Sequence, residues 1–206
     1  MWSDEGTSTM NLIDTVGYVI INNFFTQEQL DKFASDLDSS RKKRYEDCRV
    51  PDTEDNKFAF NDGMIAKSYS EQFPVFTESI LIDNQPRIEQ HLGLQLYPVC
   101  GYARIYYKHS SMYKHTDREA CEYSVTFPVK HDDGPWTIWL KNKDDIDVGV
   151  VLGLGDILIY KGCELPHWRH HYLGNEHYQI MLHYVNANGP FSHRKYDNKE
   201  ERFFKG

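Results

Sequence analysis

The stretch GDILIYKGCELPHWR, residues 155–169, decides the fold. Its opening Gly-Asp pair is typical of a turn, the run Ile157–Tyr160 of a short buried strand, and His167 of the start of the next strand. The same alternation of short β-rich runs and turn residues extends over residues 94–185. The runs cover residues 94–99, 102–107, 123–129, 136–140, 148–152, 156–160, 164–171 and 179–185. About eight short strands in this arrangement predict a double-sheet jelly roll or a barrel.

The chain before residue 94 has helical character in two places. Thr26 and Gln29 form a capping box, and apolar residues then recur at helical spacing, so we expect a helix that packs one face on a sheet. A second helical region is predicted over residues 75–91, broken or restarted at Pro86. The polar segment 40–62 between them predicts a long surface loop. The fold class is therefore mainly β (α+β), with N-terminal helices buttressing one sheet.

These patterns predict a single folded unit with short flanks. We expect a flexible N-terminus over residues 1–15 and one domain over residues 16–186. Within that domain, residues 26–92 provide helical support and residues 94–186 form the jelly-roll core. Residues 187–206 are charged, and we expect them to form a loosely held tail.

Composition excludes several functional classes. The chain of 206 residues has 31 acidic and 23 Lys or Arg residues, a net charge of −8. A nucleic-acid binder needs a basic stripe to neutralise phosphates, so we expect no nucleic-acid partner. The hydrophobic fraction of 40% excludes a disordered chain. A domain of this length buries about 70% of its unfolded surface and needs no metal to fold, so a metal site here calls for a functional explanation.

The sequence also bears on the cellular environment. No apolar run approaches the roughly 20 residues of a membrane span, and the N-terminus opens with acidic residues, so we expect no membrane association and no export. The four cysteines are far apart and include no CxxC pair. Free thiols in a reducing compartment fit this spacing better than disulfides do. We therefore expect a soluble, cytoplasmic protein.

Two His-x-Asp tripeptides are candidates for metal binding. The segment that starts at His131 continues Asp-Asp-Gly-Pro, which is typical of a hairpin turn whose polar side chains face water. His115 and Asp117 instead stand between two strand-like runs. In an extended backbone, side chains two residues apart point to the same face, so this imidazole and carboxylate could hold one cation.

A third ligand should come from a neighbouring strand, and His167 is the candidate. Two histidines and one carboxylate form the facial triad of non-haem Fe(II) oxygenases, which leaves coordination positions open. Zinc could occupy the same three residues. A structural zinc site is normally closed by four ligands, and no fourth ligand is evident in the sequence.

The order of these features resembles the Fe(II)/2-oxoglutarate-dependent dioxygenases, in particular their prolyl 4-hydroxylase-like branch. The resemblance rests on Arg104-Ile-Tyr-Tyr, His115-Thr-Asp117, the segment 155–160 and His167, and extends to the entry segment Gly17-Tyr-Val-Ile-Ile21 with its helix. It implies a double-stranded β-helix with His115, Asp117 and His167 as iron ligands. It also implies 2-oxoglutarate as cosubstrate, consumption of dioxygen, release of succinate and CO2, and hydroxylation of a prolyl-type or small-molecule C–H bond, with a peptidyl or small-molecule substrate.

The chain departs from this branch where the distal carboxylate of 2-oxoglutarate should bind. The family pattern places Lys or Arg nine or ten residues after the distal histidine, and Glu176 and His177 stand there instead. We therefore favour Arg169 as the carboxylate partner, although it could pair with a surface acid such as Glu164. His177 is an alternative, because a protonated imidazole could replace Lys. Further hydroxyl donors to the cosubstrate, which could equally be ordinary sheet residues, are Tyr107, Tyr123 and Thr126.

Two other functions remain open. The same jelly roll could be a cupin-like, non-enzymatic module that binds a metal or small ligand. An oxygenase acting on a nucleobase is a third hypothesis, which the acidic balance disfavours. Succinate formation from 2-oxoglutarate would distinguish a dioxygenase from the cupin-like module.

Overall fold

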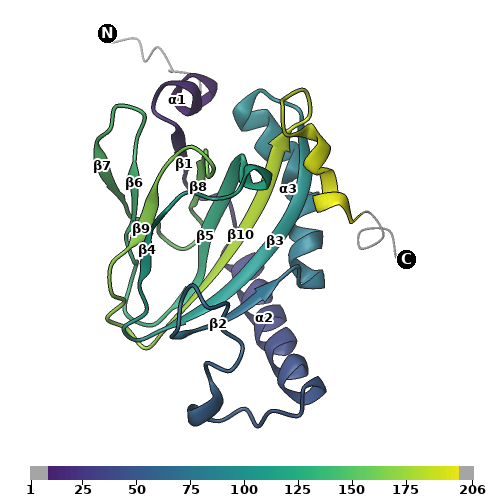
Figure 1. The fold of residues 1–206 in the computed structure, drawn as a ribbon, viewed down its shortest axis with the longest axis vertical. Helices are drawn as coiled ribbons and strands as arrows, with labels where there is room; N and C mark the ends of the chain where they lie inside the picture. The colour runs from purple at the N-terminus through teal and green to yellow at the C-terminus, as the bar shows by residue number, and fades with distance from the viewer. Residues whose placement is uncertain (1–8, 200–206) are drawn as a thin grey trace.

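The computed structural model describes residues 9–199 and consists of two antiparallel sheets with helices on one side (Figure 1). The helices are α1 (Thr9–Thr15), α2 (Gln27–Asp47) and α3 (Val75–Leu92), with 3₁₀ helices η1 (Glu54–Asn56), η2 (Glu119–Cys121) and η3 (Ser192–Asn198). The strands are β1 (Tyr18–Ile21), β2 (Ser68–Gln72), β3 (Leu96–Tyr107), β4 (Met112–His115), β5 (Tyr123–His131), β6 (Ile138–Lys141), β7 (Asp147–Val150), β8 (Ile157–Tyr160), β9 (His167–Arg169) and β10 (Glu176–Asn186).

The two sheets face each other as in a jelly roll. The large sheet has the order β1-β8-β5-β10-β3-β2, and the small sheet the order β4-β9-β6-β7. Neighbours in each sheet are antiparallel and mostly distant in sequence, such as β10, which lies between β3 and β5. Strands that are far apart along the chain therefore meet at the same end of the molecule, where their side chains can form one site.

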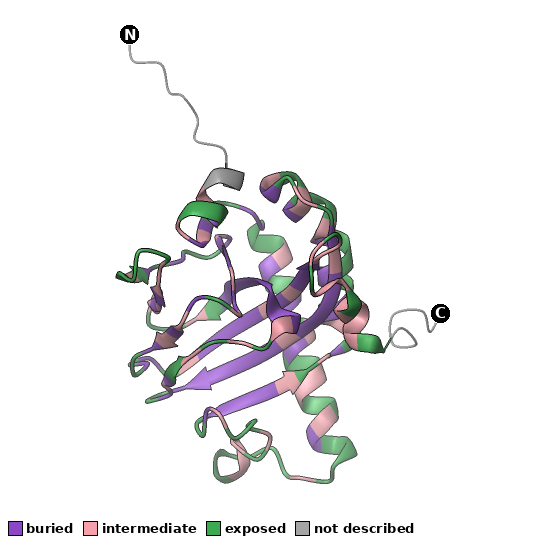
Figure 2. Cartoon of the chain, turned by 45° about the horizontal axis from the view of Figure 1, so that its top comes forward, coloured by how far each residue is buried: buried purple, intermediate pink, exposed green. Residues whose placement is uncertain are grey.

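The helices cover the outer face of the large sheet. Leu30 and Leu37 of α2 and Leu81 of α3 pack with Val125 and Phe127 of β5 in the main core. Figure 1 shows α2 and α3 on the side of the large sheet away from the small sheet, and Figure 2 shows the central strands coloured as buried. The predicted capping box at the start of α2 is present. The helices therefore pack on one face of the large sheet, and its opposite face is directed toward the small sheet.

Alternation along β5 assigns residues to these two faces. Tyr123, Val125 and Phe127 belong to the core beneath the helices, whereas Ser124 and Thr126 point between the sheets. Successive side chains of a strand point to opposite faces, so this parity fixes which residues of β5 can reach a site between the sheets.

Several elements differ from the sequence prediction. Helix α2 continues to Asp47, so the predicted loop over 40–62 begins later, and β2 and β4 were not predicted. Helix α3 continues through Pro86 without a break. Proline removes the hydrogen bond to the carbonyl four residues earlier, and Ile82 lies on the exposed side, where water can solvate its carbonyl. Gly93 ends the helix in the left-handed conformation that glycine adopts readily.

Both flanks are more ordered than the sequence predicts. Of the expected flexible residues 1–15, Thr9–Thr15 form α1, and residues 1–8 lie outside the described residues. In the expected loose tail, Arg118 Nη1 lies 2.7 Å from Asp197 Oδ1. Arg194 also pairs with Glu119. These two ion pairs tie η3 to the start of η2; residues 200–206 lie outside the described part of the chain.

None of the helices within residues 9–199 combines the length and the apolar character needed to cross a bilayer.

Candidate metal centre

His115, Asp117 and His167 converge between the two sheets. His115 ends β4 and is the direct cross-strand partner of His167, which begins β9. Asp117 Oδ1 lies 3.6 Å from His115 Nε2 and 3.7 Å from His167 Nε2. One ligand atom from each of the three residues lies within 4.8 Å of the others. The structure thus brings together the three residues singled out from the sequence, in an arrangement that could hold one cation.

Backbone carbonyls set the orientation of both imidazoles. His115 Nδ1 lies 2.9 Å from the carbonyl oxygen of Tyr113, and His167 Nδ1 lies 3.0 Å from that of Leu165. A carbonyl can only accept, so each Nδ1 carries the proton and donates it. Nε2 is therefore the nitrogen of each imidazole left to ligate a metal, and both Nε2 atoms face Asp117.

Asp117 is held so that one carboxylate oxygen remains available. Its backbone N–H donates to the Gly162 carbonyl at 2.9 Å, and Ser124 Oγ lies 3.3 Å from Oδ2. A side chain at position 162 would collide with this arrangement, because a Cβ there would lie 2.7 Å from Asp117 Oδ2 and 2.4 Å from Ser124 Oγ. Glycine at this position permits the close approach, and Oδ1 faces the two imidazoles.

The three side chains influence one another's protonation. Burial acts to lower the pKa of His115, but hydrogen bonding to Asp117 and to the Tyr113 carbonyl outweighs it and raises that pKa. Burial acts to raise the pKa of Asp117, and His115 and His167 more than offset this and lower it. Burial lowers the pKa of His167. The centre therefore favours a carboxylate next to a neutral His167, as metal binding requires.

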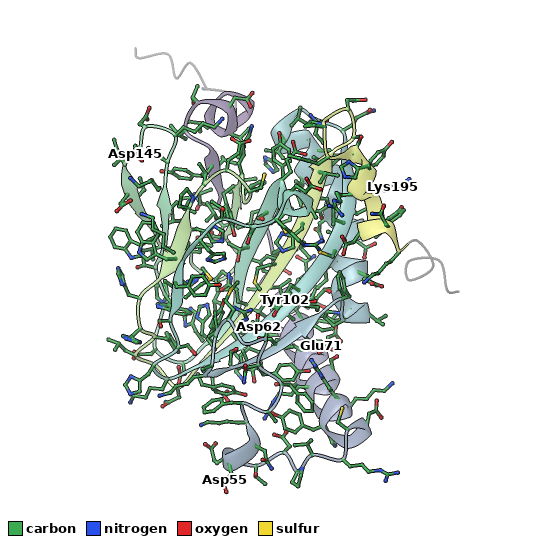
Figure 3. All side chains as sticks on the ribbon, viewed as in Figure 1. Asp55, Asp62, Glu71, Tyr102, Asp145 and Lys195 are labelled. Carbon is green, nitrogen blue, oxygen red and sulfur yellow. The ribbon has the colours of Figure 1, made fainter. Side chains whose placement is uncertain are left out.

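The trio lies on the wall of a cavity of about 550 Å³ between the sheets. Arg169, Thr126 and Gln179 line the same cavity. On another wall, Tyr102 donates its hydroxyl proton to Asp62 at 2.6 Å, and Figure 3 shows these two side chains beside each other. The cavity is large enough for a small ligand in addition to a metal ion.

Arg169 is buried in this cavity without an acidic partner. Its side chain is 4% exposed, its guanidinium lies 4.7 Å from the centroid of the Trp136 ring, and it donates to the Trp136 carbonyl. Within residues 9–199 it forms no ion pair. Glu164, the acid considered from the sequence, pairs instead with Lys161 at 3.5 Å and Lys143 at 3.7 Å. Burial lowers the pKa of Arg169. A buried cation that lacks an anion is costly, and a bound carboxylate would relieve that cost.

A hydrogen-bond chain directs a hydroxyl toward the same space. His177 Nε2 lies 2.7 Å from Gln179 Oε1, and Gln179 Nε2 donates to Thr126 Oγ1 at 2.7 Å. Because Thr126 accepts this bond, its own proton is left to donate into the cavity. Burial and the nearby Arg169 lower the pKa of His177 to about 3, so its imidazole is neutral. His177 therefore does not provide the cation considered from the sequence; it orients Gln179.

Two other candidates lie away from the cavity. Tyr107 and Tyr123 belong to the core beneath the helices, and the Tyr107 hydroxyl has no hydrogen-bond partner among the described residues. Tyr106 lines the cavity in place of Tyr107. Adjacent residues of a strand point to opposite faces, so only one of two consecutive tyrosines can reach the cavity. The sequence alone does not reveal which one does.

Three further polar residues that the sequence patterns did not single out line the cavity. Tyr160, whose hydroxyl lies 3.4 Å from His167 Nε2, stands in the predicted buried strand. Gln179 and Arg104 occupy directly paired positions on β10 and β3. Polar residues inside otherwise apolar strands were the available signal for all three.

Neither protein-family models nor curated protein sequences match this chain, whereas solved structures do. HygX from Streptomyces hygroscopicus, with nickel and 2-oxoglutarate bound, has a TM-score of 0.65 at 12% identity, covering 91% of this chain and 89% of that one. A prolyl-4-hydroxylase of Pseudomonas putida has a TM-score of 0.59 at 13% identity, covering 86% and 97%. A prolyl hydroxylase from Trichoplax adhaerens, in complex with a hypoxia inducible factor peptide fragment, has a TM-score of 0.61 at 15% identity, covering 87% and 88%. The TM-scores show a shared fold and confirm the predicted jelly roll, and at identities this low the likeness shows the fold alone.

Proposed function

We propose that the protein is a non-haem Fe(II)/2-oxoglutarate-dependent dioxygenase that hydroxylates a prolyl-type or small-molecule C–H bond. The observation that carries the proposal is the pairing, in one cavity, of the His115–Asp117–His167 trio with the acid-free cation of Arg169. The trio provides an open ligand set, and Arg169 provides an anion site. A structural zinc site would need a fourth protein ligand, and the His115–Asp117–His167 trio supplies three.

The residues present fit iron and 2-oxoglutarate. His115 and His167 would ligate through Nε2, because each Nδ1 donates to a backbone carbonyl, and Asp117 through Oδ1, which faces both imidazoles. Arg169 and the Thr126 hydroxyl would hold the distal carboxylate. When bound, iron and 2-oxoglutarate supply the oxidising chemistry: dioxygen is consumed, 2-oxoglutarate becomes succinate and CO2, and a substrate C–H bond becomes C–OH.

The chain's own contribution is to hold these groups in place and to exclude water. The Tyr113 and Leu165 carbonyls keep both imidazoles in the ligating tautomer. Burial of Arg169 strengthens its attraction for a carboxylate, because little water competes with it. The negative charge of the bound cosubstrate would in turn balance the positive charge of Arg169. The cost of burying an unpaired cation would then be relieved when the cosubstrate fills the cavity.

The proposed substrate is a prolyl-type residue of a peptide or a small molecule. The cavity volume of about 550 Å³ lies in the range of small-molecule sites. Among proteins with this fold, HygX has been solved with hygromycin B bound, and the Trichoplax adhaerens enzyme with a peptide fragment. The net charge of −8 disfavours a nucleic-acid substrate. The four free cysteines support a reducing, cytoplasmic environment.

The test has two stages. Anaerobic addition of Fe(II) and then 2-oxoglutarate should produce the visible charge-transfer band of a chelated keto acid. Admission of air should then produce succinate, and mass spectrometry of candidate peptides and metabolites should show an added oxygen. Metal binding without a 2-oxoglutarate band or succinate would favour the cupin-like binding module.

A further inference from the structure

A second group of metal-ligand atoms lies beside the first. Asp117, Cys121 and His183 each offer one ligand atom, and the three atoms lie within 4.8 Å of one another. Cys121 ends η2 and is 6% exposed, while His183 stands in β10 and is only partly buried. All three residues line the same cavity as the proposed iron ligands. We propose that this group is a second metal site, which takes a thiophilic divalent cation such as zinc.

The two oxygens of Asp117 face different partners. Oδ1 lies between the two proposed iron-ligating imidazoles, at 3.6 and 3.7 Å. Oδ2 lies 3.3 Å from Ser124 Oγ, which in turn lies 3.0 Å from His183 Nδ1. The carboxylate therefore points one oxygen toward each group, and a single aspartate can serve both.

The ligand types distinguish the two sites. Two imidazoles and a carboxylate suit Fe(II), whereas a thiolate, an imidazole and a carboxylate suit Zn²⁺, which sulfur ligands select. Zinc binding would convert the Cys121 thiol to a thiolate and release its proton to solvent. The thiolate and Asp117 together would then balance the charge of the cation. Arg118, the nearest cation in sequence, is occupied by its ion pair with Asp197.

Because both sites use Asp117, zinc in the second site should interfere with iron in the first. This step rests on the proposed function: zinc bound to Oδ2 would draw on the carboxylate that iron needs and would fill part of the cavity. Zinc should therefore inhibit turnover through Cys121. The first-site variant His115→Ala should still bind zinc at the second site, because it keeps all three second-site ligands.

Cobalt(II) is the probe for the test, because a thiolate ligand gives it a near-ultraviolet sulfur-to-cobalt charge-transfer band that imidazole and carboxylate ligands do not give. The untagged, reduced full chain is titrated with cobalt as wild type, Cys121→Ser, His115→Ala and Cys48→Ser. Cys48 is exposed and serves as the matched control for adventitious thiol binding. The band should appear in wild type, His115→Ala and Cys48→Ser, and should be lost in Cys121→Ser.

Absence of the band from the wild type, its survival in Cys121→Ser or its loss in Cys48→Ser would overturn the proposal. If Cys121→Ser does not fold, His183→Asn should weaken cobalt binding and shift the band, and an unchanged spectrum in that variant would also overturn the proposal. In the succinate assay, Cys121→Ser should raise the zinc concentration for half inhibition; inhibition that remains in this variant reports zinc at the first site, whose three ligands zinc could also occupy. If no variant forms succinate, the proposed function fails, while the cobalt spectra still test the second site.

Discussion

The two His-x-Asp tripeptides have the same residue types and different structural roles. In the first, Asp117 directs Oδ1 between two imidazoles. In the second, Asp132 accepts from the backbone N–H of Asn175 at 2.9 Å, from that of Glu176 at 3.2 Å and from the Tyr172 hydroxyl at 2.9 Å. A carboxylate whose oxygens accept backbone hydrogen bonds is a structural element, whereas one with an oxygen facing two imidazole nitrogens is a candidate metal ligand.

The difference arises from the path of the backbone after each histidine. The chain after His131 turns back on itself, and Asp132 closes that turn onto the start of β10. His131 itself stacks on His177, with ring centroids 5.9 Å apart. The first tripeptide instead begins at the last residue of β4, where His115 pairs with His167 of β9, and the Asp117 N–H then donates to the Gly162 carbonyl. Sequence context therefore carries more information about a metal site than the tripeptide does.

The largest expected effect separates the two aspartates. Asp117→Ala should abolish iron-dependent succinate formation and weaken metal binding by more than about 100-fold, beyond the loss expected for an outer-shell residue. Asp132→Ala should leave metal binding within about threefold of wild type. Equilibrium metal binding and succinate formation, measured on both variants, check this. Equal losses of metal binding and succinate formation in the two variants would contradict the different roles assigned to Asp117 and Asp132.

Replacing Arg169 should weaken binding of the cosubstrate and leave binding of the metal nearly unchanged. Arg169→Gln removes charge-assisted hydrogen bonds worth about 1.5–3 kcal/mol, so the KM for 2-oxoglutarate should rise by roughly 10–100-fold. Iron affinity should stay nearly constant, because Arg169 is not a member of the trio. An unchanged KM would mean that another residue holds the distal carboxylate.

The pH dependence of metal binding should report His115. Protons compete with the metal for the imidazoles, and the pKa of His115 is raised above its usual value. Affinity should therefore begin to fall at a higher pH than for an ordinary histidine, by up to about tenfold per pH unit below that pKa. Metal titrations across the acid range test this, and affinity that stays constant down to the ordinary histidine pKa would contradict it.

The smallest effect on the site should come from Asp132→Asn, which acts on stability. Its hydrogen bonds lower the pKa of Asp132 to about 2 against the desolvation that raises it. A depressed carboxyl pKa stabilises the fold above the unfolded value, and this contribution is lost as the pH falls toward about 2. Because Asp132 is exposed and solvent screens its interactions, urea denaturation at neutral pH should show a loss of only about 0.5–1 kcal/mol, with metal binding unchanged. A full loss of metal binding would place Asp132 in the site.

Much of the fold and the choice of the trio could be predicted from the sequence, because strand texture, turn residues and the spacing of His115, Asp117 and His167 are local patterns. The small sheet was harder to predict. Its strand β4, which was not predicted, has four residues, too few for a periodic signal, whereas β9 lies inside a predicted run.

The cosubstrate residues depended on features that a sequence does not display. Strand parity places Tyr106 in the cavity and Tyr107 outside it. Burial keeps His177 neutral, and the ion pairs of η3 fix a segment whose charge predicted a loose tail. These outcomes depend on tertiary contacts, which override local composition.

The most direct test of the central claim is succinate formation from 2-oxoglutarate with Fe(II) in air, compared between wild type and Asp117→Ala. We expect iron-dependent succinate from the wild type and none above background from the variant, with both chains folded. Succinate formed equally by both, or by neither while 2-oxoglutarate fails to bind the iron-loaded wild type, would contradict it.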